Sequence, residues 1–196
     1  MAKGLVVVIT GASSVGKGDI RDALLQDKDL KLFKSISMTT RPPKEGEIDG
    51  VNYYFVSYKD FAKKVKNKEL LEYNEFNGYY YGIPKNTIEF LTSIGKNVLI
   101  EVESQSVGSI KLQIPDALAF FVKPESIEDL KAQIAQRYKD DEASIELRIN
   151  KAKMDMELGA LFRHSVSNEN TEEAVKYIKE VVLEEMSKRN EQRKKK

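Results

Sequence analysis

Residues 5–19, LVVVITGASSVGKGD, decide the fold. They open with five apolar residues, three of them valine. Such a run predicts a strand that is buried on both faces, as strands of a parallel sheet are. The loop that follows fits the pattern G-x-x-x-x-G-K, with Gly11, Gly16 and Lys17 in the fixed places. A helix is expected next, over residues 17–26.

A loop of this pattern is suited to binding phosphate. Its glycines let the backbone curl so that successive N–H groups point at phosphate oxygens, and its lysine reaches the β- and γ-phosphates. The helix adds the positive end of its dipole. Gly18 stands where such loops usually have the Ser or Thr that helps to hold Mg²⁺, and Asp19 follows it. A glycine-rich turn without a ligand is the alternative interpretation.

Length, net charge and composition limit the classes of protein to which this chain can belong. The 196 residues predict one domain, with room for an inserted subdomain, and the net charge of +1 gives no reason to expect a nucleic-acid or membrane partner. There is no cysteine, which excludes disulfides, thiolate metal sites and cysteine nucleophiles. No apolar run approaches the roughly 20 residues of a membrane span. We expect a cytoplasmic protein.

The order of predicted elements indicates an α/β frame with a small, mostly β subdomain set into it. Aromatic and β-branched residues at 53–57 predict a strand, and residues 70–76 and 79–81 predict a hairpin around Asn77-Gly78. Outside this region strands alternate with helices, which predicts a parallel sheet covered on both faces. The predicted frame strands are residues 5–9, 32–38, 97–102, 117–122 and a short one at Val166. The predicted frame helices begin at Pro84, Ser126 and Thr171, with a long one carrying Ile145, Ile149, Met156 and Leu161 towards the core.

The loop SMTTRPPKEG, residues 37–46, places Arg41 and Lys44 three residues apart around two prolines. The prolines stiffen the loop, and an arginine beside a lysine suits a second phosphate. A solvated loop with scattered charges is the alternative. Tyr53 and residues 79–81, all tyrosine, supply hydroxyl groups near this loop.

Three carboxylates have a chemical use at such a site. Glu72 could accept hydrogen bonds from the N1–H and N2–H₂ groups of guanine, a pair of donors that adenine lacks; a solvent-facing strand residue is the alternative. Glu101 and Glu103 follow a central strand, at the edge where parallel sheets bind ligands. Such acids hold metal-bound water or a base, or else they cap a helix or pair with a lysine.

Arg137 and Arg148 flank a polar, acidic segment, residues 138–144. Phosphoryl transfer gains from cations on a mobile lid, although exposed helical arginines are common. His164 is expected to be structural or exposed. The tail, residues 188–196, has six basic residues in nine. We expect it to be the frayed end of the last helix, with an arm for an acidic partner as the alternative.

Taken together, these stretches resemble the guanylate kinase family over residues 4–186. The resemblance rests on GASSVGKG, SISMTTRPPKEGEIDGVNYYFVS, ELLEYNEFNGYYYG, VLIEVESQ and the segment between the two arginines. It implies a P-loop NTPase-type parallel sheet with helices on both faces, a small mostly β GMP-binding subdomain and a helical lid. In this chain the core would be residues 1–34, 84–136 and 149–187, the GMP-binding region 35–83 and the lid 137–148, followed by the basic tail.

The resemblance also implies an ATP:GMP phosphotransferase that uses Mg²⁺ and makes ADP and GDP. Its catalytic residues would be Lys17, Arg41, Arg137 and Arg148. Its ATP-binding residues would be Gly11, Ala12, Ser13, Ser14, Val15, Gly16, Lys17, Gly18, Asp19 and Asn168. Its GMP-binding residues would be Ser37, Arg41, Lys44, Tyr53, Glu72, Tyr81, Ile83 and Glu101. No side chain would bind Mg²⁺ directly; ATP phosphates would carry it, with water on Glu101 or Glu103 as a further contact.

Several positions depart from the family pattern. Lys44 replaces an arginine, Ile83 a Ser or Thr that contacts guanine, and Asp19 a Thr or Ser. Ser14, Ser106 and Tyr138 each replace a glycine. These departures leave open a guanylate-kinase-like binding module that recognises a partner protein, and a P-loop kinase for another nucleotide is a further alternative. The expected partners are ATP and GMP, with dGMP as a second acceptor, and the expected assembly is a monomer or a homodimer.

Overall fold

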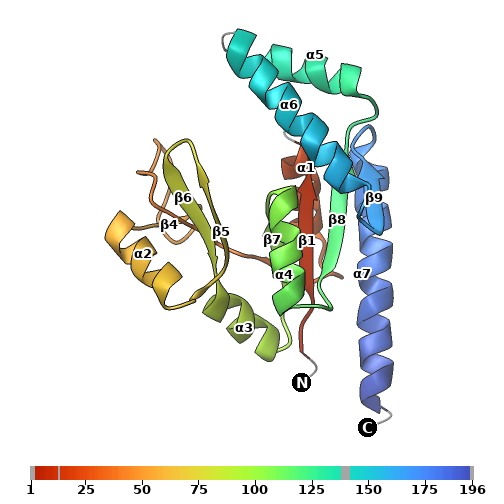
Figure 1. The fold of residues 1–196 in the computed structure, drawn as a ribbon. Coiled ribbons are helices and arrows are strands. Elements are labelled where there is room, and N and C mark those ends of the chain that lie inside the picture. Colours follow the sequence, from red (N-terminus) through yellow and green to blue (C-terminus); the bar gives the residue numbers. More distant parts are fainter. Residues whose placement is uncertain (1–2, 13, 138–141, 195–196) are drawn as a thin grey trace.

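The computed structural model describes residues 3–12, 14–137 and 142–194. Its main sheet has five parallel strands in the order β2-β7-β1-β8-β9 (Figure 1). These strands are β1 (Val6–Gly11), β2 (Leu32–Lys34), β7 (Asn97–Glu101), β8 (Leu118–Lys123) and β9 (His164–Ser167). Every residue of the central strand β1 is buried. The prediction of a parallel sheet with a doubly buried first strand is therefore confirmed.

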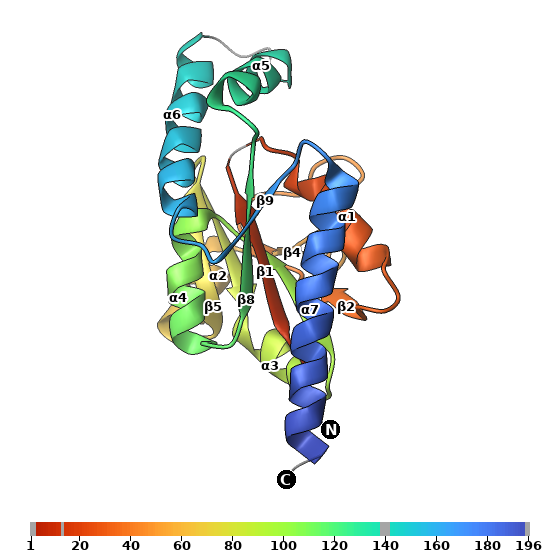
Figure 2. The same cartoon turned by 90° about the vertical axis from the view of Figure 1, so that its right-hand side faces the viewer.

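Helices cover both faces of this sheet, and the side chains of β1 alternate between two cores. Val7 and Ile9 belong to the core that α1 (Lys17–Gln26) and α7 (Thr171–Lys194) cover. Val6 and Val8 belong to the core beneath α3 (Lys85–Ser93) and α4 (Val107–Gln113). Figure 2 shows α7 and α4 on opposite sides of the sheet. This alternation explains why an unbroken apolar run was needed at β1.

A second sheet with its own small core lies within residues 38–84, and together with α2 it forms the β subdomain. The predicted bounds of this region, residues 35–83, stay a prediction. Its strands lie in the order β4-β3-β6-β5. They are β3 (Met38–Thr39), β4 (Tyr54–Phe55), β5 (Leu70–Phe76) and β6 (Tyr79–Pro84), with α2 (Tyr58–Lys66) packed on them. Asn77 and Gly78 both have positive φ, as the predicted two-residue hairpin turn requires. The core of this subdomain is built from Met38, Phe61 and Leu70.

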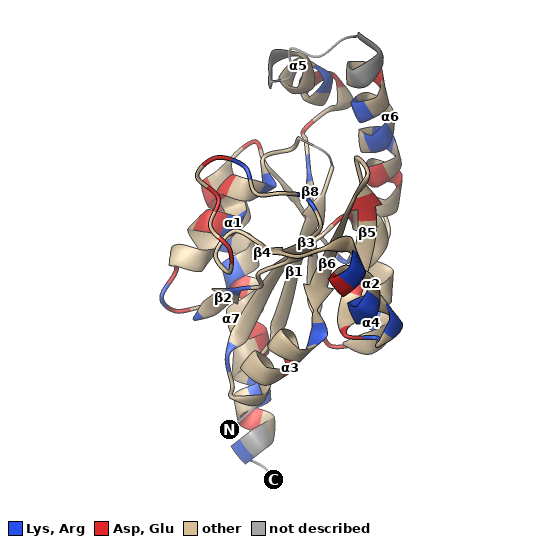
Figure 3. Cartoon of the chain, turned by 90° about the vertical axis from the view of Figure 1, so that its left-hand side faces the viewer, with Lys and Arg blue, Asp and Glu red and all other residues tan. Residues whose placement is uncertain are grey.

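Two further helices rise beyond the carboxyl edge of the main sheet. They are α5 (Ile127–Arg137) and α6 (Glu142–Gly159), and they lie above the other elements in Figure 1. A short 3₁₀ turn, Ser104–Ser106, leads from β7 into α4. Figure 3 shows both signs of charge along α6 and α2. In the described part of the chain, none of the helices combines the length and the apolar character that a membrane span needs.

Three expectations from the sequence were wrong. Residues 32–38 are not one strand, because the chain leaves the main sheet after Lys34 and enters the second sheet at Met38. Leu161 does not face the core, since α6 ends at Gly159 and Leu161 is 81% exposed. The basic tail does form the end of the last helix, as expected, but it is helical rather than frayed along its described length. The last helix α7 continues through Lys194, and Arg189 ties it to Asp116 at 2.9 Å.

Asn97 is a buried polar residue that joins three parts of the main domain. Its Oδ1 accepts a hydrogen bond from the backbone N–H of Leu5 at 2.9 Å, and its Nδ2 donates to the carbonyl of Leu30 at 2.8 Å. We predict that Asn97→Leu lowers the free energy of unfolding by about 2–4 kcal/mol, because it leaves two buried backbone groups unpaired. Urea denaturation measures this loss.

Asn150→Leu is the matched control, since Asn150 is exposed on α6. Its effect should stay within about 0.5 kcal/mol of the unchanged protein, as surface substitutions do. Equal losses for the two variants would contradict the role assigned to Asn97.

Candidate active site

A cavity of about 640 Å³ lies at the carboxyl edge of the main sheet, between that sheet and the β subdomain. It is lined from five directions: the loop after β1, helix α1, the end of β7, the β subdomain and helix α6. Of the residues expected to bind nucleotides, the lining includes Gly11, Ser14, Lys17, Ser37, Tyr53, Glu72, Tyr81, Ile83, Glu101 and Glu103. The structure therefore gathers into one space residues that are up to 92 positions apart.

The ammonium group of Lys17 holds the loop after β1. Its Nζ donates to the carbonyl oxygens of Gly11 at 2.8 Å and Ala12 at 2.9 Å. Burial lowers the pKa of Lys17, while the nearby carboxylates of Glu101, Asp155 and Glu103 oppose that shift. The lysine thus offers a cation at the cavity and shapes the loop that carries it.

The backbone of this loop is strained at one place and tightly packed at another. Ser14 has a φ of 66°, in the left-handed region that favours glycine, so its substitution for the family's glycine places strain in the loop. Gly16 has a φ of 84° and caps α1. The side chain of Asn168 donates from Nδ2 to the carbonyl of Val15 at 2.6 Å, which fixes the loop from β9's side. Ser13 lies outside the described residues.

Asp19 and Gly18 occupy the first turn of α1, beside the loop. The Asp19 side chain is exposed, and its Oδ2 lies 3.8 Å from the place that a Cβ on Gly16 would occupy. A carboxylate there is favourable to the helix dipole but brings negative charge towards an anion site. Gly18 provides no hydroxyl group for a metal ion.

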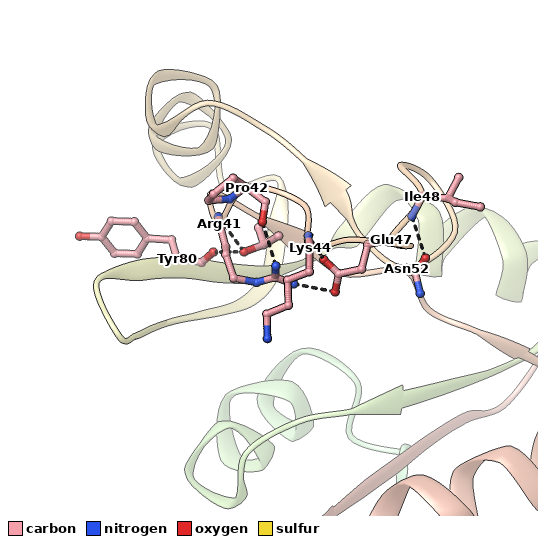
Figure 4. A network of polar contacts seen from close by, with 8 residues as sticks. Arg41, Pro42, Lys44, Glu47, Ile48, Asn52 and Tyr80 are labelled. Atoms are coloured by element: carbon pink, nitrogen blue, oxygen red, sulfur yellow. Dashed lines mark hydrogen bonds and ion pairs between the residues drawn. The ribbon is translucent and has the colours of Figure 1, made fainter. Parts of the chain in front are cut away.

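Arg41 and Lys44 lie on a folded loop beside the cavity, and Glu47 organises both. The carboxylate of Glu47 accepts from Nη2 of Arg41 at 2.8 Å and from the backbone N–H of Lys44 at 2.7 Å (Figure 4). Arg41 also donates to the carbonyl of Pro42 at 2.8 Å and stands 5.5 Å from the ring centre of Tyr53. The guanidinium lowers the pKa of Glu47. Arg41 and Lys44 thus share one organised loop, but neither is among the residues that line the cavity, and their binding of a phosphate stays a prediction.

Glu72 projects from β5 into the same cavity and is half-buried. Burial raises the pKa of its carboxyl group, and Glu103 raises it further, whereas a hydrogen bond from the hydroxyl of Ser106 lowers it. Ile83, its partner across the hairpin, is only 2% exposed and packs into the core beneath α4. Because Glu72 lines the cavity, the alternative that it is merely a solvent-facing strand residue has less support.

Both carboxylates at the end of β7 have a cation of their own. Glu101 binds Nη1 of Arg21 at 2.7 Å, and Glu103 binds Nζ of Lys151 at 2.7 Å. Lys151 also lies 4.0 Å from Asp155, which is 5% exposed and whose pKa is raised by burial. For Glu103, the alternative of pairing with a lysine is therefore what the structure has.

Sequence reasoning missed Arg21, Lys151 and Asp155, all of which line the cavity. A signal was available for each of them. Arg21 follows Lys17 by four residues, which places both on one side of α1. Arg148, Lys151 and Asp155 follow one another at spacings of three and four, so they share one face of α6.

Of the two arginines expected at the lid, the structure describes the side chain of Arg148 but not that of Arg137. Arg148 is half-buried on α6. Arg137 is the last residue of α5, and its side chain lies outside what is described. Tyr138 and the rest of residues 138–141 also lie outside it. The roles of Arg137 and Arg148 on a mobile lid stay predictions.

Gly16 and Gly18 provide a matched test of the loop geometry. A Cβ at Gly16 would lie 2.4 Å from Nδ2 of Asn168, whereas one at Gly18 would meet nothing closer than 3.6 Å. We predict that Gly16→Ala destabilises the protein by about 2 kcal/mol, through its positive φ and the displaced Asn168 side chain. Gly18→Ala should instead stabilise it by about 0.5 kcal/mol, as expected of a helical glycine. Thermal unfolding distinguishes them, and the same sign for both would contradict this geometry.

Comparison with known proteins completes the description of the site. The guanylate kinase family model matches residues 3–185. The guanylate kinase of Mesoplasma florum is 39% identical over 183 residues, 93% of this chain but 62% of that protein, so the chain spans about three fifths of that relative. The guanylate kinase of Bacillus subtilis is 38% identical over 187 residues, 95% of this chain and 92% of that protein. The crystal structure of guanylate kinase from Anaplasma phagocytophilum shares the fold, with a TM-score of 0.74 at 24% identity over 94% of this chain and 87% of that one. The chain belongs to the guanylate kinase family.

Proposed function

We propose that this chain transfers the γ-phosphoryl group of ATP to GMP and releases ADP and GDP. One observation carries the proposal. A single cavity is lined by the phosphate loop with Lys17 on one side and by Glu72 and Tyr81 on the other. Two nucleotides bound from these two sides would meet with their phosphates facing each other, as in-line phosphoryl transfer requires.

The ATP side consists of the loop after β1 and the residues that support it. The ammonium of Lys17 uses two of its three N–H donors on the carbonyls of Gly11 and Ala12, and the third reaches the phosphate oxygens of ATP in this proposal. The amino end of α1 adds its dipole to the same anion. Asn168 keeps the loop in place through Val15.

The GMP side consists of the β subdomain. Ser37, Arg41, Lys44, Tyr53 and Tyr81 bind the phosphate of GMP in this proposal. Arg41 turns its guanidinium from Glu47 to the phosphate, whose two charges attract it more strongly than one carboxylate does. Glu72 accepts the two N–H groups of guanine, and Ile83 supports it with apolar packing. GMP is the acceptor, and dGMP is a second one.

Transfer itself needs positioning and charge neutralisation rather than a covalent intermediate. Arg137 and Arg148 bring positive charge from the helices above the cavity to the transferred group. Closure of that region and of the β subdomain excludes water, which would otherwise accept the phosphoryl group in place of GMP. Glu101 and Glu103 keep Arg21 and Lys151 at the rim of the cavity.

The residues at the cavity fit a magnesium ion that arrives with ATP. Carboxylate oxygens are the ligands that Mg²⁺ prefers, and Glu101 and Glu103 supply them at the cavity edge. Both already have a cationic partner, and among the described residues no group of three or more acids or histidines could hold a metal by itself. These residues would therefore hold Mg²⁺ through its water molecules. When bound, Mg²⁺ neutralises charge on the β- and γ-phosphates.

The binding-module alternative has less support. It rested on departures from the family pattern, yet the relatives described above carry the names of enzymes. Lys17 and Glu72 both line the cavity, which supports the enzyme over the binding module. The alternative of a kinase for another nucleotide conflicts with a carboxylate at the base-binding side. Cytoplasmic location and a monomeric or homodimeric state remain predictions.

The proposed reaction is tested by measuring ADP release in a coupled assay with ATP and GMP, then with AMP, CMP and UMP. We predict turnover with GMP and turnover at least about a hundredfold lower with the other three, because they lack the paired donors that Glu72 reads. Calorimetry with GMP runs in parallel. GMP binding without ADP release would favour the binding module, and equal rates with AMP would favour another nucleotide kinase.

Lys17→Ala separates catalysis from acceptor binding. We predict that kcat falls by about two to three orders of magnitude, since a preorganised cation facing the transferred phosphates is lost. The affinity for GMP, measured by calorimetry, should stay nearly unchanged because Lys17 lies on the ATP side. A parallel loss of turnover and GMP affinity would contradict the division of the cavity into two sides.

A further inference from the structure

We propose that Ser106 positions the carboxylate of Glu72 for guanine and so helps to determine the acceptor specificity of this chain. The inference rests on the proposed function, because it assigns a second residue to the base-reading side of that site. Ser106 stands where the family pattern has a glycine, and the resemblance gave it no role.

The contact joins two separate parts of the chain. Ser106 ends the 3₁₀ turn that follows β7 and is the residue directly before α4. Its side-chain hydroxyl donates to Oε1 of Glu72 on β5, across 34 positions of sequence. Ser106 is 5% exposed, so water does not compete freely for this hydrogen bond.

Ser106 is itself held firmly, which a positioning residue must be. Its backbone N–H donates to the carbonyl of Glu103 at 3.0 Å, and its carbonyl accepts from the hydroxyl of Ser109 at 2.8 Å. At the other end of α4, Nε2 of Gln113 donates to the carbonyl of Leu71 at 2.7 Å. Helix α4 is thus fixed to β5 at both ends, and the hydroxyl of Ser106 meets Glu72 from a rigid element.

The hydrogen bond leaves Glu72 able to read a base. An ionised carboxylate has about four acceptor positions, and Ser106 uses one of them on Oε1. Oε2 and the remaining position on Oε1 are available for the N1–H and N2–H₂ groups of guanine. Only the ionised form can accept both, and a donated hydroxyl favours that form against the burial of this carboxyl group.

The hydroxyl of Ser106 also compensates for a second departure from the family pattern, at Ile83 on the strand paired with β5. Ile83 pairs with Glu72 across the hairpin and provides no hydroxyl, whereas the family pattern has Ser or Thr there. In this chain a hydroxyl next to Glu72 comes from the turn before α4 instead of from β6. The two departures, Ile83 and Ser106, therefore concern one neighbourhood of the cavity.

A double-mutant cycle between Ser106 and Glu72 tests the proposal. We predict that Ser106→Ala raises the KM for GMP about tenfold, the effect of losing a hydrogen bond to a charged group. The kcat and the KM for ATP should change less than about twofold, since only acceptor binding is affected. In a Glu72→Ala background, Ser106→Ala should add almost nothing, because its partner is gone.

Ser93→Ala is the matched control, because it removes an exposed hydroxyl that donates to the carbonyl of Phe90 within its own helix α3, without touching Ser106 or Glu72. Ser106→Gly removes the same hydroxyl and carries the test if Ser106→Ala does not fold. An unchanged KM for GMP, or an equal effect with and without Glu72, would overturn the role of Ser106. If the unaltered chain forms no GDP, the proposed function fails instead. The same double-mutant cycle is then measured through the affinity for GMP, by calorimetry.

Discussion

The bond between Lys17 and the carbonyl oxygens of Gly11 and Ala12 is the interaction on which the site depends. It ties the end of the buried strand β1 to the beginning of α1. A partly buried ammonium is costly unless its donors are paired, so both sides of this contact need each other. It keeps the loop curled, with Gly16 in the left-handed region and Ser14 forced into it as well. Without that curl the amino end of α1 would not face the cavity.

The charges around the cavity are balanced one by one, and the partners come from different elements. Glu101 on β7 has Arg21 on α1, and Glu103 has Lys151 on α6. These side chains are between 25% and 35% exposed, so each pair adds only modest stability and acts mainly to fix where the charged groups lie. Helices α1 and α6 therefore carry the positive partners, Arg21 and Lys151, and the end of β7 carries the negative ones.

Much of the fold could be read from local patterns. The run at β1, the hairpin at Asn77-Gly78 and the helix start at Ser126, whose hydroxyl accepts from the N–H of Asp129, each depend on neighbours within a few residues. The split of residues 32–38 between two sheets could not be read this way, because strand partners decide it. Leu161 was misplaced because helical spacing was extended two residues past the end of α6.

The site was predicted in its parts rather than in its pairings. Motif residues such as Glu72 and Glu101 were found because their chemistry suits a nucleotide. Arg21, Lys151 and the contact of Ser106 were missed, since a salt bridge between distant segments has no local pattern. For Arg21 and Lys151, the available signal was their helical spacing relative to Lys17 and Arg148.

The way in which the β subdomain joins the rest has a mechanical consequence. It has its own core, and the chain passes between the two sheets at only two places, after Lys34 and at Pro84. At the second crossing, Leu71 and Ile83 sit in the core of the main domain. The hydrogen bonds from Ser106 to Glu72 and from Gln113 to Leu71 add to this attachment. Any movement of the subdomain that keeps both cores closed is therefore confined to the part beyond these contacts, which includes Arg41 and its loop.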